Sequence, residues 1–160
     1  MIVVSDASPL ISLAATGYLE ILKQLYEQVI IPEAVSQEIT GSTPDLPGAS
    51  EVQTLEWIIA QSVQDHVVVR ALQSELDAGE AEAIALAVEL QADLLLIYER
   101  RARVVATRLG LNVVGVLVEA KHKSLIPHLK PILDVLITRA GFRVSPQLYE
   151  RVLQAVGESP

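Results

Sequence analysis

The sequence predicts an α/β protein in which a central parallel sheet is covered by helices on both faces. Short β-branched or leucine-rich runs alternate with helical segments along the 160 residues, as in sheets built from crossover units. Hydrophobic residues make up 51% of the chain and aromatic residues only 4%, so the core must consist of Leu, Ile, Val and Ala. This length favours a single domain spanning residues 1–160.

Five short, mostly apolar runs are expected to form the strands. They occupy residues 2–4, 29–31, 57–63, 94–97 and 113–116. The Leu-Leu-Leu-Ile run at residues 94–97 is the clearest of them.

The segments between these runs show helical spacing of apolar residues or helix-start signals. Ser8 and Pro9 suit the N-cap and first position of the first helix, and Ser145 and Pro146 suit those of the last. The predicted helices cover residues 10–15, 18–26, 33–40, 67–76, 79–90, 99–109, 117–123, 126–140 and 146–156. Those from 117 to 156 form a C-terminal helical extension, and Gly141 is expected to close the helix before the last. Residues 41–48, with two prolines and two glycines, are expected to form a loop.

The absence of cysteine excludes disulfides, zinc–thiolate sites and thiol catalysis, and suits a reducing cytoplasm. The first ten residues carry Asp6 within the apolar stretch and lack a basic segment, so we expect no signal peptide. No uncharged apolar run approaches the roughly 18 residues that a membrane-spanning helix needs. We therefore expect a cytoplasmic protein without a membrane partner.

The net charge of −8 opposes nucleic-acid binding at first sight, but the charge is unevenly distributed. Residues 1–99 carry 16 acids and 2 bases, whereas residues 100–160 carry 4 acids and 10 bases. One interpretation is a chance division over a solvated surface. The other is an acidic half that binds metal, joined to a basic half that holds phosphate groups.

Several acids lie where strands are expected to end and helices to begin. Asp6 ends the first strand, Glu38 lies on the helix after the second, and Glu80 and Glu82 lie in the first turns of another helix. Sites of open parallel sheets form outside the carboxyl ends of the strands, and carboxylate clusters suit Mg²⁺ or Mn²⁺. Each acid also has a structural interpretation: Asp6 as a turn residue, Glu38 as a solvated residue, Glu80 as a partner of the helix dipole. Periodicity alone does not separate these interpretations.

Four motifs in the same order, followed by a fifth in the tail, resemble PIN domains. They occupy residues 5–11, 31–39, 76–87, 92–97 and 141–149, so that the likeness covers nearly the whole chain. In these motifs Asp6, Glu38 and Glu80 match acids that bind metal in the family. The tail is similar to a bacterial and archaeal branch related to toxin–antitoxin ribonucleases.

The resemblance implies a three-layer PIN-like sandwich and a metal-dependent endoribonuclease that hydrolyses single-stranded RNA. Asp6, Glu38 and Glu80 would be the catalytic, metal-binding residues for Mg²⁺ or Mn²⁺, and a bound water would attack the phosphodiester. Ser8 would orient Asp6 or a water without touching the metal. The resemblance further implies a toxin neutralised by an antitoxin protein, and a homodimer or higher oligomer.

The chain departs from the family at position 98, where Tyr98 replaces the Asp expected after the strand. A phenol has a reference pKa of about 10 and supplies no charge at neutral pH. Glu99 is a further candidate ligand, but neighbours in a strand point to opposite faces, so the backbone would have to change direction. Tyr98 therefore leaves open the alternative that the domain has lost most of its cleavage activity and binds RNA or a protein. A nucleotide- or small-molecule-binding protein is a weaker alternative, resting on fold analogy.

The densest charge run follows Glu99 and contains Arg100, Arg101 and Arg103. Arginine binds phosphate oxygens bidentately, so we expect these three residues to contact RNA beside the acids. A solvated helix face is the alternative.

Overall fold

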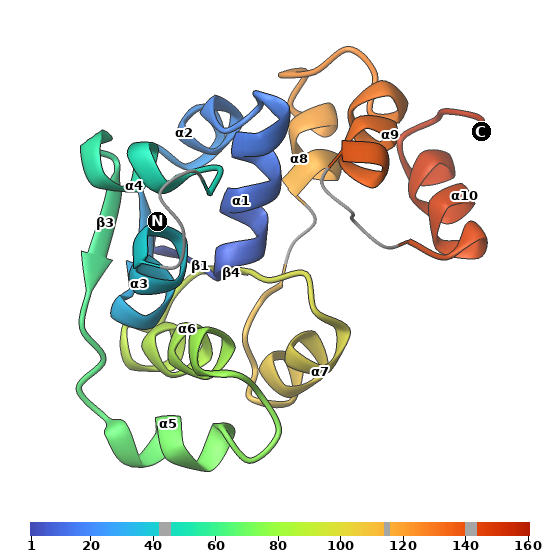
Figure 1. The fold of residues 1–160 in the computed structure, drawn as a ribbon. Coiled ribbons are helices and arrows are strands. Elements are labelled where there is room, and N and C mark those ends of the chain that lie inside the picture. Colours follow the sequence, from blue (N-terminus) through green and yellow to red (C-terminus); the bar gives the residue numbers. More distant parts are fainter. Residues whose placement is uncertain (42–45, 114–115, 140–143) are drawn as a thin grey trace.

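In the part of the chain that the structure describes, four parallel strands form the central sheet (Figure 1). The computed structural model describes residues 1–41, 46–113, 116–139 and 144–160. The strands are β1 (Val3–Ser5), β2 (Val29–Pro32), β3 (Ile58–Gln61) and β4 (Leu94–Leu96). They lie in the order β3-β2-β1-β4, and every pairing is parallel. The predicted α/β class with a parallel central sheet is confirmed.

Alternating side chains of the strands feed two apolar clusters, one on each face of the sheet. Val3 and Leu96 belong to the first cluster, whereas Val4 and Leu95 belong to the second. The first cluster is completed by α1 (Ala7–Thr16), α2 (Glu20–Tyr26), α3 (Glu33–Gly41), α4 (Ala49–Thr54), α8 (Val116–His122), α9 (Lys130–Arg139) and α10 (Pro146–Ala155). The second is completed by α5 (His66–Leu72), α6 (Ala78–Glu89) and α7 (Arg100–Arg108). Among the described helices, none is long and apolar enough to cross a membrane.

The first helix begins earlier than predicted. Asp6 occupies the N-cap position of α1 in an extended conformation, so that Ser8 and Pro9 lie inside the first turn. Proline is tolerated there because the first N–H groups of a helix have no partner within it. The prediction of Ser8 as the cap is therefore wrong, and the acid that follows β1 stands directly at the start of α1.

The structure describes only the two ends of the predicted fifth strand, residues 113–116. Val113 forms a single parallel bridge with Leu95, and Val116 already begins α8. Residues 114–115 lie outside the described residues. The prediction is therefore supported at Val113 and wrong at Val116, because a short apolar run does not by itself distinguish a strand from the start of a buried helix.

Two further departures concern connections. The helix α4 was not predicted, and α9 begins at Lys130 rather than at residue 126. Pro127 disfavours helical backbone at residue 126, whereas Pro131 lies in the first turn of α9, where proline is tolerated. Part of the predicted loop, residues 42–45, and the predicted helix end at 140–141 lie outside the described residues.

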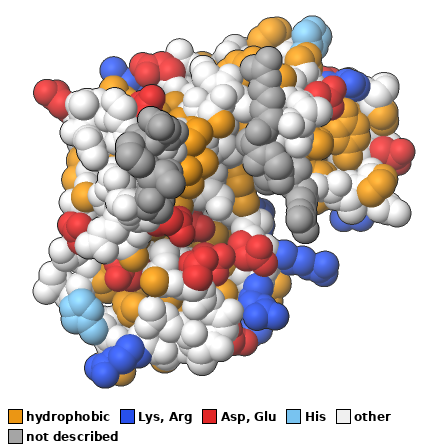
Figure 2. All heavy atoms as spheres, in the orientation of Figure 1, with side chains coloured by type: hydrophobic (Ala, Val, Ile, Leu, Met, Phe, Trp, Pro, Cys, Tyr) orange, Lys and Arg blue, Asp and Glu red, His pale blue; other side chains and the backbone are white. Residues whose placement is uncertain are grey.

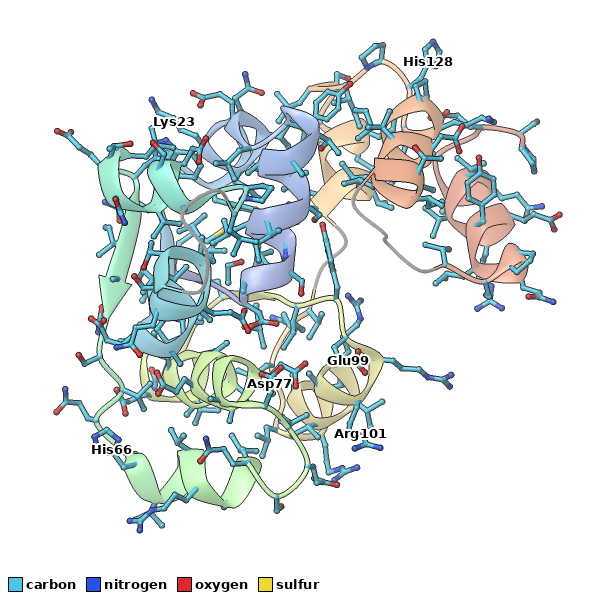
Figure 3. The ribbon with its side chains drawn as sticks, viewed as in Figure 1. Lys23, His66, Asp77, Glu99, Arg101 and His128 are labelled. Atoms are coloured by element: carbon cyan, nitrogen blue, oxygen red, sulfur yellow. The ribbon has the colours of Figure 1, made fainter. Side chains whose placement is uncertain are left out.

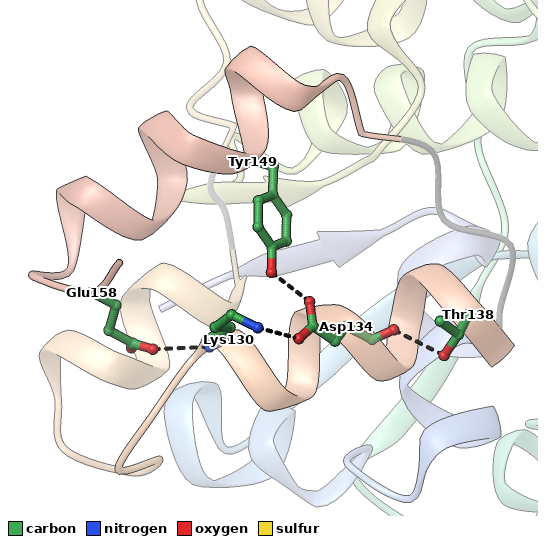
Figure 4. Close-up of polar contacts among 5 residues, drawn as sticks. All are labelled: Lys130, Asp134, Thr138, Tyr149 and Glu158. Atoms are coloured by element: carbon green, nitrogen blue, oxygen red, sulfur yellow. Dashed lines mark hydrogen bonds and ion pairs between the residues drawn. The ribbon is translucent and has the colours of Figure 1, made fainter. Parts of the chain in front are cut away.

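Polar contacts join the C-terminal helices to one another (Figure 4). Glu158 accepts hydrogen bonds from the backbone N–H groups of Leu129 and Lys130, at 2.7 and 3.0 Å, and so caps the start of α9. Lys130 pairs with Asp134 at 2.8 Å, and the Tyr149 hydroxyl donates to Asp134 at 2.5 Å. Together these contacts link α9, α10 and the segment after α10.

Candidate functional site

The carboxyl ends of the strands carry a buried aspartate. Asp6 follows β1, and its backbone N–H donates to the Leu96 carbonyl of the neighbouring strand at 2.9 Å. Asp6 is only 5% exposed, although most aspartates of folded proteins are exposed to water. The fold therefore holds a carboxylate at the edge of the sheet where sites of parallel sheets form.

Gly79 makes room for this carboxylate at the start of α6. A Cβ atom at residue 79 would lie 3.4 Å from Asp6 Oδ1, 3.7 Å from Asp77 Oδ1 and 3.6 Å from a Val35 methyl group. Two carboxylate oxygens thus border the space that glycine leaves open. We call this space the Gly79 cradle. The start of α6, the helix α3 and the end of β1 meet around it.

Glu80 and Asp77 form reciprocal hydrogen bonds that start α6. The Glu80 N–H donates to Asp77 Oδ1 at 2.8 Å, and the Asp77 N–H donates to Glu80 Oε2 at 3.2 Å. This arrangement is a capping box, so Glu80 does serve the helix terminus. Asp77 was not among the predicted site residues, although the Asp-x-x-Glu spacing before an apolar helix signals such a box.

The four acids Asp6, Glu38, Asp77 and Glu80 share one electrostatic environment. Burial raises the pKa of Asp6 to about 7, a backbone hydrogen bond from Ala7 opposes this, and Asp77, Glu80 and Glu38 raise it further. The pKa of Glu38 is raised by partial burial and then by Asp77, although the residue as a whole is exposed. Three of the acids thus disfavour the ionised form of Asp6, and the site concentrates negative charge.

Glu80 itself is half-buried, which raises its pKa. The hydrogen bond with the Asp77 backbone lowers the Glu80 pKa, whereas the charges of Asp77, Glu99 and Glu38 raise it. Glu99 therefore lies within electrostatic reach of Glu80. Figure 3 shows Asp77 and Glu99 at the starts of α6 and α7, on the same side of the molecule.

The shifted pKa of Asp6 predicts a pH-dependent stability in metal-free protein. An unfolded Asp titrates near 3.8, so between about pH 4 and 7 the folded state binds the extra proton and is favoured at lower pH. This stabilisation is complete below the unfolded pKa and is lost as the pH rises through about 7. Between pH 5 and pH 8 we expect Asp6→Asn to remove up to about 3 kcal/mol of this dependence. Thermal unfolding of wild type and Asp6→Asn with chelator at pH 5 and pH 8 measures this dependence. If the stability of the variant changes between the two pH values as much as that of wild type, the expectation is contradicted.

Tyr98 does not supply the charge of the acid it replaces. The residue is half-buried, and burial raises the pKa of its phenol, while a hydrogen bond with the Ser12 side chain and the charge of Arg103 lower it. Ser12 is itself buried on α1. A neutral phenol thus packs against the first helix at the end of β4. Glu99 is exposed and acts as the N-cap of α7, with the Arg101 N–H at 3.4 Å from its Oε1.

The three predicted arginines differ in their surroundings. Arg100 and Arg101 are exposed at the start of α7, whereas Arg103 is half-buried and donates to the Ile97 carbonyl at 2.8 Å. Arg103 therefore fixes the segment after β4 as well as carrying charge. Figure 2 shows a band of acidic side chains across this face, with Lys and Arg side chains beside it over α7.

A shallow pocket of about 330 Å³ lies along α7 and includes an arginine that the sequence did not single out. Arg100, Arg101 and Arg108 line it, together with two valines and two glutamates. One of those glutamates is Glu99, so the pocket adjoins the acids. The repeat of basic residues along the helix after position 100 could have identified Arg108 from the sequence.

A roomier hollow of about 760 Å³ lies at the opposite, amino-terminal edge of the sheet. It is lined by the segment before β2 and by Met1, Glu56 and Trp57. None of the four clustered acids borders it. We therefore assign the candidate site by chemistry rather than by size, to the carboxyl edge.

A family model for the PIN domain matches residues 2–158. The chain belongs to the PIN-domain family. The predicted family and its PIN-like α/β sandwich are thereby confirmed. A search among curated proteins gave no match. PIN domains are generally nucleases, so this PIN domain has a nuclease- or RNA-related function.

PIN domains typically use divalent metal ions, and the residues present fit such an ion in their chemistry. Both oxygens that border the Gly79 cradle are carboxylate oxygens, which Mg²⁺ and Mn²⁺ prefer. Within the described residues, however, no three His, Asp or Glu side chains converge closely enough to hold an ion. Glu80 instead turns back onto the Asp77 N–H. The structure thus gathers the predicted acids Asp6, Glu38 and Glu80 in one region, with Asp77 added.

Proposed function

We propose that this PIN domain is an endoribonuclease that uses Mg²⁺ or Mn²⁺ to hydrolyse phosphodiester bonds in single-stranded RNA. The observation that carries the proposal is the buried Asp6 carboxylate, whose pKa is raised by burial and by three neighbouring acids. Such a concentration of negative charge is unfavourable without a cation, and a divalent ion would relieve it.

Asp6, Glu38 and Glu80 would hold the cation. When bound, the cation would supply a water activated for attack and a positive charge that stabilises the phosphodiester as it reacts. Asp77 orients Glu80 through the capping hydrogen bonds, and Glu99 is a further candidate ligand. The exposed Ser8, in the first turn of α1, would orient a water near Asp6.

The RNA backbone would lie over the start of α7. Arg100 and Arg101 are exposed and line the pocket that adjoins Glu99, so a phosphate group held there would lie beside the acids. Arg108 extends the same basic lining, and Arg103 remains a predicted RNA contact through its remaining N–H groups.

A second candidate function is a domain that binds RNA or a protein but has lost most cleavage. The observation that favours it is Tyr98, a neutral phenol hydrogen-bonded with Ser12 where the family has an acid. A site without that carboxylate would bind a cation less tightly. The two candidates share the fold and the basic surface and differ in the activity of the wild-type protein.

The proposal also includes the biological setting that the resemblance implied: a cytoplasmic toxin, neutralised by an antitoxin protein and assembled as a homodimer or higher oligomer. It treats residues 1–160 as one PIN-like domain. Support for one domain comes from α8, α9 and α10, which contribute to the same apolar cluster as α1.

Metal removal tests the proposed reaction directly. Purified protein is incubated with a labelled single-stranded RNA in Mn²⁺, in Mg²⁺, and after treatment with a chelator. We expect internal cleavage with either ion, none with chelator, and recovery when the ion is restored. The same RNA in a duplex is the control substrate. Cleavage that persists undiminished after chelation would contradict the metal-dependent reaction.

A further inference from the structure

One hydrogen bond joins the two helices that carry Glu38 and Glu80. The half-buried Glu82 carboxylate on α6 accepts from the backbone N–H of Ala34, the second residue of α3, at 3.0 Å. The residue before α3 is Pro32, whose side chain has no hydrogen-bond acceptor. The first turn of α3 therefore receives an acceptor from a different helix.

This bond lies close to both acids along their helices. Glu38 stands four residues, about one turn, after Ala34, and Glu80 stands two residues before Glu82. The two helices pack together, and the Gly79 cradle brings the start of α6 against Val35 of α3. A shift of α3 along α6 would therefore change the position of Glu38 relative to Asp6.

We propose that Glu82 is a positioning residue that fixes Glu38 relative to Asp6 and Glu80. The inference rests on the proposed metal-dependent function. Apolar contacts between helices tolerate small slides, whereas a hydrogen bond to one backbone N–H fixes the axial position of a turn. The negative charge of Glu82, placed at the start of α3, also interacts favourably with the positive end of the α3 dipole.

Mn²⁺ binding in the absence of RNA tests the inference. We expect Glu82→Ala to weaken Mn²⁺ binding by roughly tenfold, as is usual when a residue supporting a ligand is removed. Glu82→Gln retains an amide oxygen that accepts the same hydrogen bond, so its affinity should stay within about threefold of wild type. Titration calorimetry or the paramagnetic resonance signal of free Mn²⁺ gives the affinities.

Glu89→Ala is the matched control on the same helix. Glu89 accepts hydrogen bonds from the backbone N–H groups of Gln64 and Asp65, both at 2.9 Å, at the start of α5. Its removal deletes the same kind of contact away from the acids. We expect a loss of thermal stability with Mn²⁺ affinity unchanged.

The Glu38→Gln background separates positioning from general destabilisation. If Glu82 acts through Glu38, Glu82→Ala should have little further effect on Mn²⁺ affinity once Glu38 is neutralised. Fully additive losses, or an equal loss in Glu89→Ala, would overturn the inference. Equal losses in Glu82→Gln and Glu82→Ala would overturn it too, because they would identify Glu82 as a direct ligand.

This inference can fail while the proposed function holds. Wild-type protein that binds neither Mn²⁺ nor Mg²⁺ would contradict the metal-dependent reaction and, with it, the role of Glu82. Wild-type binding that is lost in Asp6→Asn but unaffected by Glu82→Ala would retain the reaction and overturn only the positioning role.

Discussion

Asp6→Asn is expected to lower cleavage of single-stranded RNA on the order of a hundred- to a thousandfold. The substitution keeps the shape of the side chain and removes the charge of the most buried acid in the site. Asparagine is also a favourable N-cap residue, so α1 should still begin at Ala7. Initial cleavage rates at saturating Mn²⁺ measure the effect.

The loss should not come from unfolding. Because the pKa of Asp6 is raised to about 7, its charge opposes folding at pH 8, and the neutral variant should be at least as stable there. Asp65→Asn is the matched control, since Asp65 is the N-cap residue of α5 and accepts from the Val68 N–H at 3.2 Å. Asp6→Asn with wild-type rates would remove Asp6 from the reaction.

Tyr98→Asp is expected to raise Mn²⁺-dependent cleavage by roughly ten- to a hundredfold. It places a carboxylate after β4, where the resemblance to PIN motifs implies an acid, beside the strand that leads to Asp6. The gain should appear mainly as tighter Mn²⁺ binding, since the added charge completes a set of oxygen ligands. A wild type without cleavage and an active Tyr98→Asp would favour the binding-domain interpretation of the natural chain.

Tyr98→Asn is the control that separates charge from size. Both substitutions delete the ring, lose the hydrogen bond with Ser12 and should lower the unfolding free energy by about 3 kcal/mol. Only the Asp variant adds a negative charge. Equal activities of the two variants would show that removing the ring, rather than adding a ligand, causes any gain.

The sheet was predictable because each strand is a short apolar run followed by a polar residue or a helix start. Asp6 after β1 and Tyr98 near the end of β4 were located correctly from this pattern alone. Val116 was not, because it belongs to the same apolar run as the paired Val113 but begins α8. Local patterns specify burial more reliably than they specify backbone conformation.

The candidate site was predictable only in the residues that belong to sequence motifs. Asp6, Glu38 and Glu80 were named from their motifs, and the structure places them in one electrostatic environment. Asp77 and Glu82 act through backbone N–H groups, and the Glu82 contact joins residues 48 positions apart in the chain. No spacing rule along one segment reports a contact of that kind.

Gly79 has a consequence for how the site can be controlled. Its missing side chain leaves space between the buried Asp6 carboxylate, the Asp77 carboxylate and a Val35 methyl group. A single methyl group there would meet Asp6 Oδ1 at 3.4 Å, a distance that packing tolerates. Alanine would therefore fit at residue 79, whereas a longer side chain would crowd the Asp6 carboxylate without altering any of the four acids.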